Sequence, residues 1–136
     1  SSVDVYGAPK IKDFILHEDQ NLKPNNWYAR SKVVSEEIFF KKKNNFKCVS
    51  LRIPGVIVVE SHKNFPVLLN LMHKLKLGEK VNIHNSASKF NNVIDAEEIS
   101  KVINKILLMK EFNEVFNLAA SGPMKFLDVI KLIKKN

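Results

Sequence analysis

Short apolar runs alternate with longer amphipathic stretches along this chain, and this alternation constrains the fold more than any other feature. Five runs bounded by turn residues predict strands, at residues 3–6, 46–53, 80–83, 90–94 and 114–118. Four stretches with apolar residues at helical spacing predict helices, at 27–43, 65–77, from Asp95 to Leu107, and 126–133. Strands that alternate with helices are typical of an α/β fold with a largely parallel sheet.

Turn and capping residues mark the ends of several of these elements. Pro54-Gly55 breaks the strand at 46–53, and Gly78 ends the second helix. Asp95 with Glu98 three residues later forms a capping-box pattern at the start of the third helix. Residues 8–25 are predicted to form a long loop, which is uncommon in a compact domain unless the loop serves a functional site.

The composition is that of an ordinary globular protein. With 136 residues, 45% of them hydrophobic and 26% charged, the chain is sized for one domain and is not of a disordered class. No apolar run approaches the roughly 20 residues that cross a bilayer, and no signal-peptide pattern is present. The single cysteine, Cys48, excludes an internal disulfide and a cysteine-clustered metal site. We therefore expect a cytoplasmic protein without a metal centre.

The positive charge allows several kinds of partner. Lys and Arg number 22 against 14 acidic residues, which gives a net charge of +8. Such a charge suits nucleic acid, an acidic surface or a phosphorylated ligand. However, Arg30 and Arg52 are the two arginines of the chain, and arginine is the residue that makes bidentate phosphate and base contacts. Binding to nucleic acid is therefore the weakest of the functional alternatives.

The candidate catalytic residues lie near the amino end of the chain. Tyr28 and Lys32 stand four residues apart on the first predicted helix, so both project from one face. A lysine ammonium close to a phenol favours the phenolate, which can then serve as a general base. Ser2, at the end of a predicted strand, could donate a hydrogen bond to the same substrate oxygen. Taken alone, the pair is weak evidence, since most such pairs are surface accidents and a serine can simply satisfy a strand terminus.

Five motifs in series strengthen this interpretation, and together they resemble the extended short-chain dehydrogenase/reductases. The branch that the chain resembles is the NAD-dependent sugar-nucleotide epimerases and dehydratases. The resemblance runs through all 136 residues in order. The five motifs are Ser1 to Gly7, Tyr28 to Lys32 with Glu36, Leu51 to Val56, Phe90 to Asp95 and Val115 to Leu118. Glu18 and the segment Lys23 to Trp27 fit the family between the first two.

The resemblance implies roles for the matching positions. Tyr28 would move the proton of a sugar hydroxyl during hydride transfer, and Lys32 would assist Tyr28 and bind the nicotinamide ribose. Ser2 would hydrogen-bond the reacting oxygen and complete a Ser-Tyr-Lys triad. The backbone at Pro54, Gly55 and Val56 would lie against the nicotinamide of NAD or NADP. The implied activity is that of an epimerase, dehydratase or reductase acting on a nucleotide-linked sugar.

At the positions that would contact the substrate, the sequence matches the family only in part. Asp4 falls where dehydratase relatives carry an acidic residue, but Val3 replaces the acidic neighbour, which favours an epimerase or a reductase. A segment near the second predicted helix lines the sugar-nucleotide pocket in the family, which suggests Asn64, Phe65 and Leu69 as contacts. Ser88 stands where an arginine is expected to hold the nucleotide diphosphate, so the adjacent Lys89 is the remaining candidate cation.

The family's glycine-rich dinucleotide loop has no counterpart here, because the four glycines are Gly7, Gly55, Gly78 and Gly122. We therefore expect one partial domain over residues 1–136, the second half of a Rossmann-type doubly wound sheet with small carboxy-terminal substrate-binding elements. Residues 1–55 would be the catalytic part of the sheet, and residues 56–136 would mix late-sheet and substrate-side elements. Such a chain would be a fragment with unpaired strand edges, inactive by itself and possible as a homodimer. The alternative is a non-catalytic remnant or binding module of the same fold.

Overall fold

The computed structural model of the chain describes residues 1–8, 15–42, 46–58, 67–82, 89–90, 93–109, 114–120, 122 and 124–135. Within these residues it is an α/β protein with parallel strands, which confirms the predicted fold class. The helices are the 3₁₀ helix η1 (Val3–Tyr6), α1 (Trp27–Lys41), α2 (Val67–Lys76), α3 (Ala96–Leu107) and α4 (Phe126–Lys135). The strands are β1 (Val49–Arg52), β2 (Gly55–Ile57), β3 (Lys89–Phe90), β4 (Val93–Asp95), β5 (Glu114–Asn117) and β6 (Met124–Lys125).

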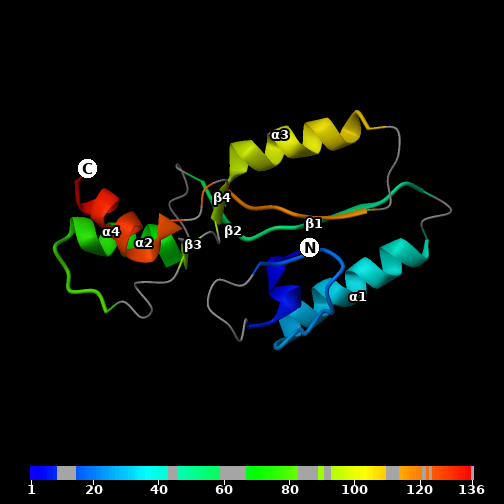
Figure 1. Cartoon of the computed structure of the whole chain (residues 1–136), viewed down its shortest axis with the longest axis horizontal. Helices are drawn as coiled ribbons and strands as arrows, with labels where there is room; N and C mark the ends of the chain where they lie inside the picture. The colour runs from blue at the N-terminus through cyan, green and yellow to red at the C-terminus, as the bar shows by residue number, and fades with distance from the viewer. Residues whose placement is uncertain are drawn as a thin grey trace.

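The strands form three pairs. β1 runs parallel to β5, with Val49 opposite Glu114 and Arg52 opposite Asn117. β2 runs parallel to β4, and β3 pairs with β6 in antiparallel fashion. Figure 1 shows α1 on one side of the β1–β5 pair and α3 on the other, which is the layering of a Rossmann-like sheet.

A smaller unit lies at the carboxy-terminal end. In Figure 1, α2 and α4 pack side by side, away from α1. Leu71 of α2 and Ile130 of α4 are buried at the centre of this unit. Half-buried apolar side chains surround them, namely Ile57, Met72, Leu75, Val81, Val93, Phe126, Val129 and Ile133. The described helices include none that is long and apolar enough to cross a membrane.

Side-chain caps begin two of the α-helices. The Asn26 carboxamide accepts a hydrogen bond from the Ala29 N–H at 2.8 Å, which starts α1 just before Tyr28. Asp95 caps α3 as predicted, by accepting from the Glu97 N–H at 2.8 Å. The second half of the predicted capping box is wrong, because the Glu98 carboxylate lies 2.8 Å from Lys101 Nζ instead. An ion pair one turn along the helix has replaced the reciprocal cap.

The predicted strand at residues 3–6 is wrong, since these residues form the single 3₁₀ turn of η1. The Ser2 hydroxyl accepts a hydrogen bond from the Asp4 N–H at 3.2 Å, and the Gly7 N–H closes the turn on the Asp4 carbonyl at 3.0 Å. Such local bonds compete with strand pairing, so the extended run ends at Ser2.

Two further strand predictions need correction. Residues 80–82 have no regular structure, and Ile83 lies outside the described residues. The single strand predicted at 90–94 is two short strands, β3 and β4, with residues 91–92 outside the description. β3 pairs with β6 and β4 pairs with β2. One apolar run therefore serves two separate pairs, and the spacing of its residues gave no sign of this division.

Gly7 is required where η1 meets the following loop, because its φ is +74° and an added Cβ would lie 2.2 Å from the Lys23 carbonyl oxygen. We expect Gly7→Ala to lower the free energy of unfolding by at least about 2 kcal/mol, through left-handed strain and the backbone clash. Gly122→Ala is the matched control, because Gly122 has φ +77° with nothing within 4 Å of the added Cβ. Urea denaturation of both variants separates the clash from the strain, and equal losses would refute the clash.

Candidate active site

One cavity of about 380 Å³ brings together most of the predicted site residues. We call it the site cavity. It lies where the amino-terminal turn, the start of α1 and the segment joining β1 to β2 meet. Its lining residues are Ser1, Ser2, Val3, Asp4, Tyr28, Ile53, Pro54, Gly55 and Val56. The predicted positions Ser2, Asp4, Tyr28 and Pro54 to Val56 are therefore neighbours in space, although the sequence separates Ser2 from Val56 by 54 residues.

Tyr28 and Lys32 lie one turn apart on α1, as the helical spacing predicts. The Lys32 ammonium lies over the Tyr28 ring, 5.1 Å from the ring centroid, which is a cation–π distance. The Tyr28 side chain is 53% exposed and borders the site cavity, so its phenol is accessible to a bound molecule. Lys32 does not line the site cavity and instead borders a second cavity between α1 and β1.

Ser2 is buried at the floor of the site cavity. A parallel bridge to Ile53 holds its backbone beside the end of β1. Its hydroxyl oxygen accepts from the Asp4 N–H, so the hydroxyl caps η1 and keeps its own proton available to donate. The structural role that the sequence left open for Ser2 is therefore present, and it is compatible with a hydrogen bond to a ligand.

The far wall of the site cavity is the segment between β1 and β2. Pro54 is buried and lies between the two strands, where its missing N–H cannot continue a ladder. The chain resumes at Gly55 to pair with β4 rather than with β5. Gly55 and Val56 thus present backbone and a small apolar surface to the cavity, with no charged group.

A buried ion pair fixes α1 to β1 beside this site. The Arg52 guanidinium meets the Glu36 carboxylate in a fork, with Nε to Oε1 at 3.1 Å and Nη2 to Oε2 at 2.8 Å. The Ser50 hydroxyl adds a bond to Glu36 Oε1 at 2.9 Å. Arg52 is 4% exposed and Glu36 8% exposed, so both charges are held by these partners rather than by water.

The Arg52 guanidinium also binds η1 and the loop directly, and it connects to β5 through the Tyr6 hydroxyl. Arg52 Nη1 donates to the Tyr6 hydroxyl of η1 and, at 3.1 Å, to the Glu18 carbonyl of the loop. The Tyr6 hydroxyl donates in turn to the Asn117 side chain of β5 at 2.7 Å. The Asn117 N–H donates to the Glu18 carboxylate at 2.8 Å. The network thus connects the amino-terminal turn, the loop, α1 and the β1–β5 pair, and it sets the position of Tyr28 relative to Ser2.

The ionisation of Glu36 links this network to pH. Burial by itself raises the pKa of Glu36, but hydrogen bonds from Arg52, Ser1 and Ser50, together with the charge of Arg52, outweigh burial and hold this pKa below its ordinary 4.5. A carboxyl whose folded pKa is lowered stabilises the fold above its unfolded pKa, and that stabilisation is lost as pH falls through the folded pKa. The stabilising effect of Glu36 should therefore be complete above pH 4.5 and fade below it.

We expect the difference in stability between the unmodified chain and Glu36→Gln to shrink as pH falls below 4.5. Denaturation curves across the acid range measure it. Glu37→Gln is the matched control, because Glu37 is the exposed neighbour on the same helix. A difference for Glu36→Gln that is flat with pH, like that of the control, would contradict the assignment.

Four predicted substrate contacts are not tested by this geometry. Asn64 and Phe65 lie outside the described residues. Leu69 belongs to α2 and Lys89 to β3, opposite Lys125, but the side chains of both lie outside the description. In the part of the chain that is described, no three His, Cys, Asp or Glu side chains gather as metal ligands would.

Sequence reasoning assigned no role to three residues of the network, Tyr6, Ser50 and Asn117. A signal for one of them existed. Ser50 and Arg52 are two apart in a strand and so share a face, which is unusual for polar residues in an otherwise apolar run. Two polar residues on one buried face require a partner on the covering helix, and Glu36 is that partner.

The chain is similar to known proteins in its structure, whereas sequence comparisons find no match. No family model and no curated protein sequence matches the chain. Among solved structures, UDP-glucuronic acid 4-epimerase from Bacillus cereus, in complex with NAD, superposes with a TM-score of 0.82 at 19% identity, over 99% of this chain and 44% of that one. UDP-N-acetylglucosamine 4-epimerase from Methanobrevibacter ruminantium gives 0.74 at 23% identity, over 98% and 43%. RMD from Pseudomonas aeruginosa, complexed with NADPH, gives 0.75 at 21% identity, over 97% and 47%.

The fold is Rossmann-like and shared with these three proteins. At such identities the likeness establishes the fold, and the predicted fold class is confirmed by it. The chain spans less than half the length of the structures that it matches. Almost the whole of this chain superposes in each case, so its η1, loop and strand pairs have counterparts within a larger protein fold.

Proposed function

We propose that this chain carries the proton-transfer part of an NAD(P)-dependent enzyme that acts on a nucleotide-linked sugar, as an epimerase, dehydratase or reductase. The observation that carries the proposal is the site cavity, where the Tyr28 phenol, the Ser2 hydroxyl and the Pro54 to Val56 wall converge beside Lys32. The fold shared with sugar-nucleotide epimerases supports it. The proposal includes the division into residues 1–55 and 56–136 and the cytoplasmic location inferred from the sequence.

Each side chain has a distinct part in the proposed chemistry. Tyr28 accepts the proton of a sugar hydroxyl while a hydride leaves the carbon that bears this hydroxyl, and it returns the proton when the carbonyl is reduced. The Lys32 ammonium lies over the Tyr28 ring, 5.1 Å from its centroid, and so places a positive charge beside the proposed proton carrier. Ser2 donates its hydroxyl proton to the reacting oxygen as a hydrogen bond. Pro54 to Val56 form an uncharged wall on the other side of the reacting carbon.

The residues present fit one end of a dinucleotide. When bound, NAD(P) would supply the hydride acceptor and donor. Lys32 and Tyr28 would hold its ribose, and the small, uncharged surface of Gly55 and Val56 suits a flat ring. The phosphate-binding end lacks a counterpart in this sequence, because no two of the four glycines lie in one turn. Tight cofactor binding in the proposal therefore needs a glycine-rich turn supplied from outside these 136 residues.

A homodimer through α1 belongs to the same proposal. Val34 and Ile38 lie one turn apart on that helix and are half exposed, which leaves an apolar surface on α1. Size-exclusion chromatography with light scattering would test it, and a monomer at high concentration would exclude it.

A non-catalytic binding module of the same fold is the second candidate. One observation favours it: the Ser2 hydroxyl already has a structural partner in the Asp4 N–H. In that case the network around Arg52 would persist for stability, and no hydride transfer would occur.

The test begins with the polypeptide as its own cells produce it. Its intact mass is measured, and the purified protein is assayed for bound NAD(P) and for interconversion of UDP-linked sugars. Retained cofactor with turnover would support the enzyme. A protein of this chain's mass that retains no cofactor and has no turnover would support the binding module.

A further inference from the structure

The positive charge of the chain is concentrated in its carboxy-terminal unit, which we define as residues 67–82, 89–90 and 124–135. These residues hold eight lysines against two acidic residues, Glu79 and Asp128. The unit therefore supplies most of the net charge of +8. The lysines whose side chains the structure describes here are all exposed, namely Lys74, Lys76, Lys80, Lys125, Lys131 and Lys134.

The outer face of α4 combines this charge with apolar surface. The inner face of α4 packs on α2, with Ile130 buried at the centre. Among the described side chains of α4, the exposed ones are Leu127, Lys131, Leu132 and Lys134. Leu127 is 42% exposed and Leu132 is 49% exposed. The solvent face of a helix normally carries polar side chains, so leucines among lysines suit a partner that is both negatively charged and apolar.

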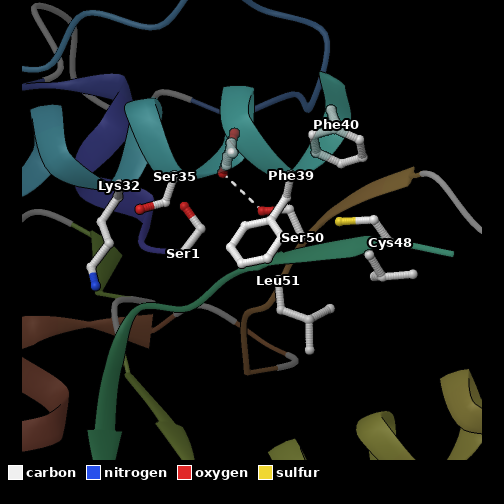
Figure 2. Close-up of a pocket in the computed structure, with 10 residues that line it drawn as sticks. Ser1, Lys32, Ser35, Phe39, Phe40, Cys48, Ser50 and Leu51 are labelled. Atoms are coloured by element: carbon white, nitrogen blue, oxygen red, sulfur yellow. Dashed lines mark hydrogen bonds between the residues drawn. The ribbon is translucent and has the colours of Figure 1, made fainter. Parts of the chain in front are cut away.

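This surface is separate from the two cavities beside α1. The site cavity and the cavity between α1 and β1, which Figure 2 shows, are both lined by residues between Ser1 and Val56. Within the described part of the carboxy-terminal unit, one ion pair is present, between Asp128 and Lys131 at 3.2 Å. That pair is exposed and offsets little of the charge. The unit thus presents a positive surface of its own, away from the candidate active site.

We propose that the carboxy-terminal unit binds the surface of an anionic lipid bilayer, with the outer face of α4 against the membrane. Lys131 and Lys134 contact acidic headgroups, and Leu127 and Leu132 enter the boundary between headgroups and acyl chains. Stable peripheral binding takes two signals, and this face supplies a basic one and an apolar one. The proposal rests on this surface and not on the proposed catalytic function.

The side chains that accompany the charge favour a lipid surface over nucleic acid. Proteins that bind nucleic acid use arginine for bidentate contacts and aromatic side chains for stacking on bases. The carboxy-terminal unit has no arginine, and its aromatic residues are Phe90 and Phe126. Phe126 packs against the core of the unit. Exposed leucines beside lysines are instead typical of helices that lie in a membrane interface.

The experiment measures how the full chain partitions onto lipid vesicles, by sedimentation. One set of vesicles is phosphatidylcholine alone, and the other contains about 30% phosphatidylserine. The first variant combines Lys131→Gln with Lys134→Gln on α4. Its matched control combines Lys101→Gln with Lys105→Gln on α3. Each variant removes two exposed positive charges, one of them from an exposed ion pair.

A second variant tests the apolar part of the surface. It combines Leu127→Gln with Leu132→Gln, and glutamine has nearly the helix propensity of leucine, so α4 should persist. Circular dichroism of all variants checks that their helices are kept.

We expect the partition coefficient onto the anionic vesicles to exceed that onto phosphatidylcholine by at least about tenfold. The α4 lysine variant should lower this coefficient at least about fivefold, and the α3 control by less than about twofold. The leucine variant should also lower it at least about fivefold, since the binding that remains would be electrostatic and screened by salt.

Three results would overturn the proposal. The first is equal partition onto the two kinds of vesicle, and the second is an equal loss in the α4 and α3 lysine variants. The third is an unchanged coefficient in the leucine variant. Displacement of the chain from the anionic vesicles by oligothymidylate at equal negative charge would overturn it in favour of nucleic acid.

Discussion

Replacing Arg52 with methionine is expected to lower the free energy of unfolding by about 3–5 kcal/mol, which is the usual effect of removing one partner from a buried ion pair. Methionine fills much of the same volume, so the loss comes from charge rather than from a cavity. Glu36 would keep the Ser50 hydroxyl at 2.9 Å but lose both guanidinium contacts. Tyr6 and the Glu18 carbonyl would lose a donor in the same step. Urea denaturation of the 136-residue chain measures the effect.

The double variant Glu36→Leu with Arg52→Met separates charge from packing. It removes both charges, so it should recover a large part of the loss seen with Arg52→Met alone. The pH dependence should also weaken. Arg52→Met removes the hydrogen bonds and the charge of Arg52 that lower the pKa of Glu36, so less stability should be lost as pH falls below 4.5 than in the unmodified chain. A double variant as unstable as the single one would show that Arg52 acts through Tyr6 and Glu18 rather than through Glu36.

The order of elements could be predicted from this sequence because each signal is local. The spacing of residues predicts the helix around Tyr28 and Lys32, and Asp95, as the N-cap, marks the start of α3. Likewise, Pro54-Gly55 marks the point where β1 ends and the chain moves to another strand pair. The joint position of Ser2, Tyr28 and Pro54 came from the resemblance and not from any local pattern.

The buried network could not be predicted because its partners are far apart in the sequence. Tyr6 and Asn117 are 111 residues apart, and nothing near either one signals the other. The structure of residues 3–6 escaped prediction for a different reason. Their apolar pattern suits a strand, but the Ser2 side chain and Gly7 offer the backbone local hydrogen bonds that win over pairing. Polar side chains at the ends of a short apolar run therefore deserve more weight than its hydrophobicity.

Replacing Tyr28 with phenylalanine in the native protein, assayed with NAD(P), is expected to lower kcat by about 10²-fold or more, because the phenol oxygen is the proposed proton carrier. The fold should not change. Tyr28 is half exposed, and the phenylalanine ring preserves the surface against which the Lys32 ammonium lies. Substrate affinity should change little, since the lost group acts on the reacting proton. Steady-state kinetics with a UDP-linked sugar, beside thermal unfolding of both proteins, measure the two effects.

Trp27→Phe is the matched control, because Trp27 is the preceding aromatic residue of α1, is 82% exposed and does not line the site cavity. It should leave kcat within about twofold, since a surface substitution away from the chemistry has a small effect. Equal losses from both substitutions would mean that α1 tolerates no change near its start, and the proton-transfer role would lose its support. An unchanged kcat in Tyr28→Phe would remove that role outright. The site cavity would then be a binding surface, with the Arg52–Glu36 network serving only to hold its walls.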